Sequence, residues 1–223
     1  MKEIKKLVNK LSNIQKLEII AVIIISIVFI NFVLPTFARF KNRNSIVNVT
    51  SWDGTVSTSY RKGDGTKSNP YVISNGNELA FFEYNLRTND YANTYFEISS
   101  DIILNPGIFN VTDAGIFYIL DSNEYVVDLN TNEYKTKDGV VAGSFKTLDS
   151  LKNFKRTLNG TLHTIHGLYM NKKGNNGLFD SLEGEINNLY VKNALINGGD
   201  TSGIIAENSN NAKLTEVQVK EII

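Results

Sequence analysis

The chain has 223 residues, and its 23 lysines and arginines are balanced by 23 aspartates and glutamates. A formal net charge of zero gives no electrostatic reason to expect nucleic acid or a strongly acidic partner. The absence of cysteine excludes disulfides, thiol nucleophiles and cysteine-based metal sites. The length accommodates one domain of ordinary size plus an appended segment.

The first two segments of the chain predict a membrane anchor. Residues 1–16 are rich in lysine, with apolar residues at helical spacing, and form either an amphipathic helix on the inner leaflet or a charged flank that sets topology. Residues 17–38 are almost continuously apolar, and about 20 such residues cross a bilayer as a helix. Lysines before the span outnumber Arg39, Lys41 and Arg43 after it, which predicts a single-pass protein with a cytoplasmic N-terminus and an extracellular remainder.

The anchor has a second interpretation as a signal peptide. Thr36, Phe37 and Ala38 resemble a small-x-small cleavage site after Pro35. The apolar run is longer than a typical signal-peptide core, so we expect an uncleaved signal anchor in the cell membrane. Cleavage after Ala38 would instead secrete the chain to the cell surface. Residues 39–51 are a polar linker, and residues 52–223 are the exported domain.

The domain opens with turns, short strands and one helix. Asp53 and Asp64 each precede Gly-Thr. They lack the alternating carboxylates of a calcium loop, so turn chemistry is the preferred interpretation. A helix is predicted over residues 75–88, where apolar residues recur at helical spacing after Asn75 or Asn77 as a cap. Nearby aromatic residues suggest a core, with a sugar-binding platform as the alternative. They are Phe81, Phe82, Tyr84, Tyr91, Tyr95 and Phe96.

Residues 106–143 do not repeat the pattern around them. Short apolar stretches alternate with turns rich in Asp, Asn and Gly, which predicts hairpins inserted into the domain. Such an insertion is a natural place for binding function.

The C-terminal third repeats itself. Residues 164–171 align with residues 185–192 at a period of about 21, and residues 213–220 align with residues 185–192 after about 28. The phrase Gly177-Leu178-Phe179 recurs as Gly203-Ile204-Ile205 about 26 residues on. The residues that carry these repeats are Ile165, Gly167, Leu168, Gly177, Leu178, Phe179, Gly184, Ile186, Leu189, Val191, Gly203, Leu214, Val217 and Val219.

Repeats of this length predict an all-β solenoid of stacked coils joined by parallel ladders. We expect Ile165, Ile186 and Leu214 to stack as neighbours in one apolar column. The helix over residues 75–88 is expected to cap the N-terminal end, because an open ladder edge recruits other strands. Residues 217–223 read as a strand with nothing behind it. The chain is therefore expected to be a fragment, or to have this edge covered by further coils or another chain.

The repeats also resemble a known family. Gly177-Leu178-Phe179, Gly184, Ile186, Leu189 and Val191 look like the GLUG motif of bacterial surface proteins. Residues 158–168 resemble the phrase that precedes GLUG coils, except that its usual glycine is Leu162. The resemblance implies a right-handed parallel β-helix on the cell exterior, often in adhesin-like proteins.

The sequence contains few signals of catalysis. No Gly-rich phosphate loop, HExxH or GxSxG sequence occurs. His163 and His166 would point to opposite faces of a strand, which disfavours shared metal binding. Asp180, Glu183 and Glu185 cluster near one turn. Paired carboxylates serve glycoside hydrolysis, and β-helix lyases add a basic residue, for which the candidates are Lys172 and Lys173. Solvated turn charges are the preferred interpretation.

The sequence therefore predicts a membrane-anchored bacterial surface module for adhesion or surface structure, without cofactor, metal or catalytic residues. Its expected partners are the membrane and host or cell-wall glycans or proteins, not nucleic acid. Two alternatives stay open. One is a carbohydrate-active β-helix enzyme, a polysaccharide lyase or hydrolase. The other is a cell-envelope scaffold that self-assembles.

Overall fold

A computed structural model describes residues 50–88, 93–174, 176–198 and 202–222. The basic segment and the predicted membrane span lie outside these residues. Within the described part of the chain, no helix is both long enough and apolar enough to cross a bilayer. Residues 49–223 form one compact unit, and the description below concerns that unit.

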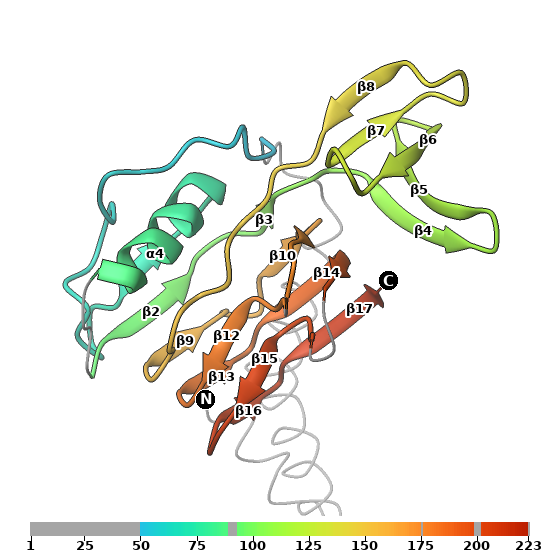
Figure 1. Cartoon of the computed structure of the whole chain (residues 1–223). Helices are drawn as coiled ribbons and strands as arrows, with labels where there is room; N and C mark the ends of the chain where they lie inside the picture. Colours follow the sequence, from blue (N-terminus) through green and yellow to red (C-terminus); the bar gives the residue numbers. More distant parts are fainter. Residues whose placement is uncertain (1–49, 89–92, 175, 199–201, 223) are drawn as a thin grey trace, which may run out of the picture. The chain divides into compact units, whose positions relative to one another are not determined.

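The unit is mostly β structure and contains a parallel β-solenoid of about five turns with one short helix (Figure 1). One sheet has the order β1-β2-β9-β13-β16, and a second joins β3, β10, β11, β14 and β17. A third face pairs β12 with β15. The solenoid strands are β1 (Tyr71–Ile73), β2 (Tyr95–Ile98), β3 (Ile102–Ile103), β9 (Thr157–Asn159), β10 (Thr164–His166), β11 (Tyr169–Asn171), β12 (Phe179–Leu182), β13 (Glu185–Asn187), β14 (Tyr190–Asn197), β15 (Ala206–Ser209), β16 (Lys213–Thr215) and β17 (Gln218–Ile222).

Apolar side chains from successive turns form columns inside the solenoid. One column follows the first sheet and consists of Tyr71, Phe96, Leu158, Ile186 and Leu214. Another follows the second sheet and consists of Ile102, Ile165, Val191 and Val219. Single coils cannot bury such residues, so the stacking itself creates the core. Burying each Leu, Ile or Val contributes about 1.5–3 kcal/mol.

The predicted alignment at a period of about 21 residues is wrong. Ile165 pairs with Ile102 and Val191, not with Ile186, whereas Ile186 does stack on Leu214. Residues 164–171 contain β10, a corner and β11, while residues 185–192 contain β13, a different corner and the start of β14. The same apolar spacing thus describes two different corners of a coil. In the turns that follow the inserted residues, the pairs that stack are separated by 26 to 28 residues, as Asn171–Asn197 and Glu185–Lys213 illustrate.

The helix forms where the sequence predicts it, as α4 (Gly76–Thr88). Asn75 caps it by accepting a hydrogen bond from the Glu78 amide at 3.0 Å, and Glu78 reaches back to accept one from the Ser74 amide at 2.7 Å. The buried Leu79, Phe82 and Leu86 lie on its inner face and join the solenoid core. Helix α4 contacts β1, the strand at the opposite end of its sheet from β16.

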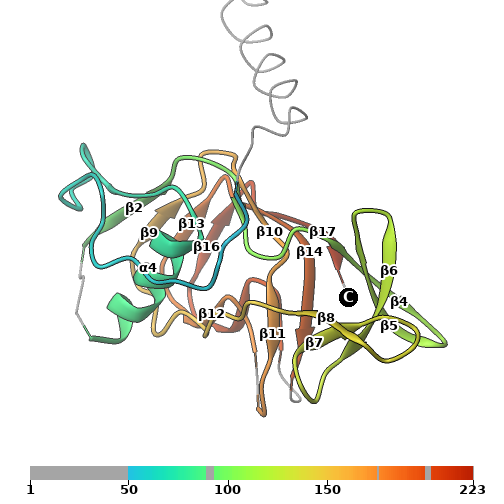
Figure 2. The ribbon, with the colours of Figure 1, turned by 90° about the horizontal axis from the view of Figure 1, so that it is seen from above.

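Five further strands form an antiparallel sheet in the connection between β3 and β9. We call it the inserted sheet. Its strands are β4 (Ile108–Thr112), β5 (Gly115–Leu120), β6 (Asn123–Asp128), β7 (Glu133–Lys135) and β8 (Val141–Ser144). Figure 2 shows that the inserted sheet and α4 lie on opposite sides of the solenoid.

A second, aromatic core fixes the inserted sheet to the solenoid. Phe109, Tyr118 and Phe145 come from the insertion and its return, and Tyr169 and Leu195 come from β11 and β14. The Phe145 and Tyr169 rings stack with centroids 4.4 Å apart. Because both parts of the molecule share this core, the inserted sheet is held in place rather than tethered.

Candidate functional site

The three carboxylates singled out in the sequence are each neutralised by a lysine from a neighbouring turn. The pairs are Lys152–Asp180 at 2.8 Å, Lys155–Glu183 at 3.1 Å and Lys213–Glu185 at 2.7 Å. The Lys213 hydrogen bond lowers the pKa of the Glu185 carboxyl. Each of the three carboxylates therefore has its own lysine partner. The structure does not bring any two of them together as a catalytic pair of carboxylates. Exposed pairs of this kind contribute up to about 1 kcal/mol each.

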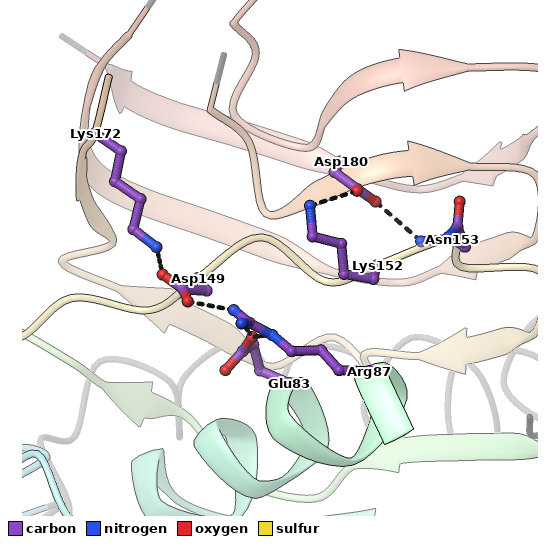
Figure 3. Close-up of polar contacts among 7 residues, drawn as sticks. All are labelled: Glu83, Arg87, Asp149, Lys152, Asn153, Lys172 and Asp180. Atoms are coloured by element: carbon purple, nitrogen blue, oxygen red, sulfur yellow. Dashed lines mark hydrogen bonds and ion pairs between the residues drawn. The ribbon is translucent and has the colours of Figure 1, made fainter. Parts of the chain in front are cut away.

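A denser group of charges lies where α4 meets the loop before β9 (Figure 3). Asp149 contacts both Arg87 and Lys172, and Arg87 also binds Glu83 at 2.5 Å. Burial raises the pKa of the Glu83 carboxyl, although Arg87 opposes this effect. Burial, followed by the nearby Arg87 cation, lowers the pKa of Lys172.

This group and the Lys152–Asp180 pair are drawn together in Figure 3, and we call them the charged band. Asp180 also accepts a hydrogen bond from the Asn153 amide at 2.9 Å, so its carboxylate crosslinks two turns. The positive and negative groups of the band match one another in number. Such a surface offers many hydrogen-bonding groups without a net field that would attract a polyanion.

Sequence reasoning identified Asp180 and Lys172 but missed Arg87, Asp149 and Lys152. A signal for part of the band was present: Lys152 precedes Asp180 by 28 residues, which is also the spacing of Glu185 and Lys213. Opposite charges one turn apart would have indicated cross-coil pairs once the correct period was known.

A polar cleft of about 280 Å³ lies at the corner that precedes the first sheet. Residues at the same corner of successive turns line it, including Tyr95, Lys155, Glu183 and Lys213. Arg156, which is only 7% exposed, is also part of its wall. The cleft runs across turns, so it is suited to an elongated polar ligand rather than to a compact apolar one.

The inserted sheet holds a second recess, of about 490 Å³. Its walls combine aliphatic side chains, such as Ile116, Val126 and Leu129, with polar ones that include Asp128 and Lys135. Asp128 and Lys135 form an ion pair at 2.6 Å. The hydrogen bond from Lys135 lowers the pKa of Asp128, and the same bond raises the pKa of Lys135. The recess is open to solvent and combines apolar with charged walls, so it does not by itself indicate a particular ligand.

The two histidines serve separate local contacts. His163 Nδ1 lies 3.2 Å from Asp101 Oδ1, and His166 Nε2 lies 3.1 Å from the Gly107 carbonyl. The His166 ring also contacts the Asn193 amide at 3.3 Å. These contacts join each ring to a different part of the chain and do not bring the rings to one shared ligand.

The two Asp-Gly-Thr turns have the same hydrogen bonds. The Asp53 carboxylate accepts bonds from the amide and the hydroxyl of Thr55, at 2.9 and 2.7 Å. Asp64 does the same with Thr66, at 3.0 and 2.8 Å. These bonds lower the pKa of both aspartates, and they are the turn chemistry that the sequence indicates.

The aromatic residues around α4 divide between core and surface. Phe82 and Phe96 are buried, and their ring centroids lie 4.6 Å apart. Tyr84 is 57% exposed, and Tyr91 lies outside the described residues. The described members therefore do not share one exposed aromatic platform.

The repeat residues lie on the structural columns and corners rather than around a ligand site. In the inner turns they are buried, as for Leu168, Leu178 and Leu189. In the last turn the burial declines: Val217 and Val219 are partly buried, and Leu214 is 52% exposed. Gly203 donates a backbone hydrogen bond to Asn176 at 2.9 Å, and a Cβ on Gly184 would lie 2.2 Å from the Arg156 carbonyl oxygen.

No protein-family model, curated protein or solved structure matches the chain.

Proposed function

We propose that this chain is a membrane-anchored module of the bacterial cell surface, whose β-helix serves adhesion or surface structure and is not catalytic. The observation that carries the proposal is the inserted sheet, which packs on the solenoid through a shared aromatic core. Rigid scaffolds that present a separate element are suited to recognition. The apolar run over residues 17–38 supports a position outside the cell.

Several finer features belong to the same proposal. The GLUG-like residues favour a right-handed coil and a surface role. Helix α4, next to the edge strand β1, is suited to capping the N-terminal end of the stack. In the last described turn, at the opposite end of the sheet from β1, Leu214 is half exposed.

Location and adhesion are tested in bacteria that express the full chain with a C-terminal epitope. The proposal predicts that external protease removes the epitope from intact cells and that the N-terminal segment stays with alkali-washed membranes. Cells should also gain adhesion to at least one surface from a panel of matrix proteins, host glycans and cell-wall polymers. An epitope protected in intact cells, or a chain released from the membranes into the cytosol, contradicts the proposal.

The charged band supports a second candidate, a carbohydrate-active enzyme. This candidate is supported by two shifted groups near Asp149: the pKa of the Glu83 carboxyl is raised, and the pKa of the Lys172 amine is lowered. Shifted pKa values of this kind are common at catalytic sites. Incubation with pectins, chitin and host glycans, followed by product analysis, decides between the candidates. Any activity should be lost in Lys172→Ala or Asp180→Ala if this band performs the chemistry.

The half-exposed last turn supports a third candidate, a scaffold that assembles end to end. Light scattering of the full chain should then show growth with concentration, and Leu214→Lys should prevent it. A strictly monomeric chain rules this candidate out.

A further inference from the structure

Asp149, in the charged band, contacts two cations at once. Lys172 Nζ contacts Asp149 Oδ1, and Arg87 Nη2 contacts Oδ2, the second oxygen of the same carboxyl group. The Asp149 carboxyl group therefore lies between a primary amine and a guanidinium group (Figure 3). An amine that attacks a carboxyl carbon needs this arrangement, in which the nucleophile is in contact and a positive group lies where negative charge develops.

A second carboxyl group lies beside this pair. Glu83 Oε1 lies 2.5 Å from Arg87 Nη2, the same nitrogen atom that contacts Asp149. The Glu83 side chain is only 13% exposed, and burial raises the pKa of its carboxyl group. A carboxyl group with a raised pKa holds a proton more readily than an ordinary glutamate and can pass it on. Glu83 is therefore placed to carry protons during a reaction between the other two side chains.

The surroundings of Lys172 favour the reactive form of its amine. Burial, followed by the nearby Arg87 cation, lowers the pKa of Lys172, whereas Glu83 opposes this shift. The neutral amine is the nucleophilic form. Lys172 and Asp149 are 44% and 37% exposed, so a water molecule released between them has a path to solvent.

A second lysine with two acidic neighbours, in the inserted sheet, shows the opposite electrostatic arrangement. Lys135 contacts Asp128 at 2.6 Å and Glu133 at 3.5 Å. The hydrogen bond between Lys135 and Asp128 raises the pKa of Lys135 and lowers the pKa of Asp128. That pair is therefore held as ammonium and carboxylate, which do not react with one another. Only the Lys172–Asp149 pair combines contact, a neighbouring guanidinium group and a weakened charge on the amine.

We propose that Lys172 and Asp149 become joined by an amide bond within the folded chain, without another protein or a cofactor. Lys172 Nζ bonds to Asp149 Cγ, and the bond from Cγ to Oδ1 breaks. Oδ2 stays on Arg87 and becomes the amide oxygen. Oδ1 leaves as water with two protons that come from the Lys172 ammonium group, and Glu83 transfers them.

This reaction is balanced, because one ammonium and one carboxylate become one neutral amide and one water. Contact between the groups replaces a bimolecular encounter, and well-oriented intramolecular reactions reach effective concentrations of about 10⁵–10⁸ M. The inference goes beyond the proposed function and does not depend on where the chain resides.

The bond would close one coil of the solenoid into a ring. Asp149 lies before β9 and Lys172 directly follows β11, so β9, β10 and β11 lie between them. The chain has no cysteine, so a disulfide cannot serve this purpose. A crosslink stabilises a fold mainly by restricting the unfolded chain, and this one would tie the segment that returns from the inserted sheet to the end of the same coil.

The test is the intact mass of the full chain, purified in detergent and then denatured. We expect a mass that is one water lower than the sequence requires, and digestion should give a branched fragment that joins residue 149 to residue 172. Lys172→Arg keeps the positive charge but should restore the full mass, because a guanidinium group stays protonated. Glu83→Gln should slow the loss of water from pulse-labelled chain by about tenfold or more.

The matched control is Lys152→Arg, because Lys152 is 48% exposed and pairs with Asp180 in the same band; this variant should keep the lower mass. Cyclisation at an Asp-Gly sequence also removes one water, but it gives no branched fragment and persists in Lys172→Arg. The Asp-Gly sequences begin at Asp53, Asp64 and Asp138.

Three results would each overturn the proposal: a natural chain of full mass, a lower mass without a fragment that joins residues 149 and 172, or loss of water at the natural rate in Glu83→Gln. The mass and the branched fragment are read from the natural chain. The test therefore stays decisive even if a variant does not fold.

Discussion

Replacing Glu216 by asparagine should stabilise the last turn of the solenoid. Glu216 has a left-handed backbone, with φ of 52°, and so does Asn188 one turn earlier. The two positions are equivalent because Asn187 pairs with Thr215 immediately before them. Asparagine tolerates this conformation, whereas glutamate does not benefit from local hydrogen bonding there.

The expected gain is about 1 kcal/mol. A left-handed backbone costs an ordinary L-residue about 1–2 kcal/mol, and asparagine recovers part of that. The Glu216 side chain is exposed, so its removal leaves no cavity. A gain of about 1 kcal/mol corresponds to a fivefold change in a local opening equilibrium.

Hydrogen exchange of the last-turn amides measures this change directly. The Gln218 amide donates to the Leu189 carbonyl at 3.0 Å, so it exchanges when the last turn opens. It should exchange about five times more slowly in Glu216→Asn. Lys220→Asn is the control, because Lys220 is exposed in a strand and asparagine should bring no gain there. Unchanged exchange in Glu216→Asn, or equal slowing in the control, refutes the reasoning.

Three further predictions follow from single contacts. Gly167→Ala should destabilise the fold by about 3 kcal/mol or more in denaturant titrations, because φ is 72° and the new Cβ would lie 1.9 Å from the Asn105 carbonyl oxygen; a neutral effect would contradict this packing. Burial raises the pKa of Tyr118 and Tyr169 to about 12. The stability of the fold should therefore fall as pH rises from about 10 through 12. Absorbance titration should show both phenols ionising at higher pH than ordinary tyrosines. Hydrogen bonds from Thr66 lower the pKa of Asp64, so the ionised Asp64 carboxylate stabilises the fold above about pH 4, and this stabilisation is lost as pH falls. The stability difference between the natural chain and Asp64→Asn should therefore shrink on acidification. A difference that stays constant with pH would argue against this role of Asp64.

The solenoid was predictable because its residues repeat, but the register was not. Ile186 and Leu214 lie in equivalent corners, and their spacing identifies one full turn. Ile165 carries the same local pattern at another corner, because every corner of a coil needs an apolar residue before and after a tight bend. The local pattern alone therefore cannot say which corner a segment occupies.

Two consecutive left-handed residues form one of the tight turns of the solenoid. Leu162, which stands where the GLUG-associated phrase has glycine, has φ of 67°. Together with Thr161, at 45°, it forms a turn closed by a hydrogen bond of 2.7 Å from the His163 amide to the Gly160 carbonyl. A turn with two positive φ values favours glycine, so at Leu162 the backbone rather than the side chain is constrained.

The candidate sites were only partly predictable. Asp180 was recognisable as a charge near a turn, but its pairing with Lys152 depends on which turns are neighbours. The recess in the inserted sheet depends on how five hairpin strands twist, and sequence alternation sets the faces of a sheet without setting its curvature.

Disulfide trapping tests the stacking register most directly, since the natural chain has no cysteine. Lys192 pairs with Lys220 across neighbouring turns, and paired residues on adjacent strands lie within the range of about 4.4–6.8 Å between Cα atoms that a disulfide needs. Lys192→Cys combined with Lys220→Cys should therefore crosslink under mild oxidation. Lys192→Cys combined with Asn171→Cys, which the 21-residue alignment would bring together, should not crosslink. Crosslinking of the second pair without the first would contradict the stacked columns described above.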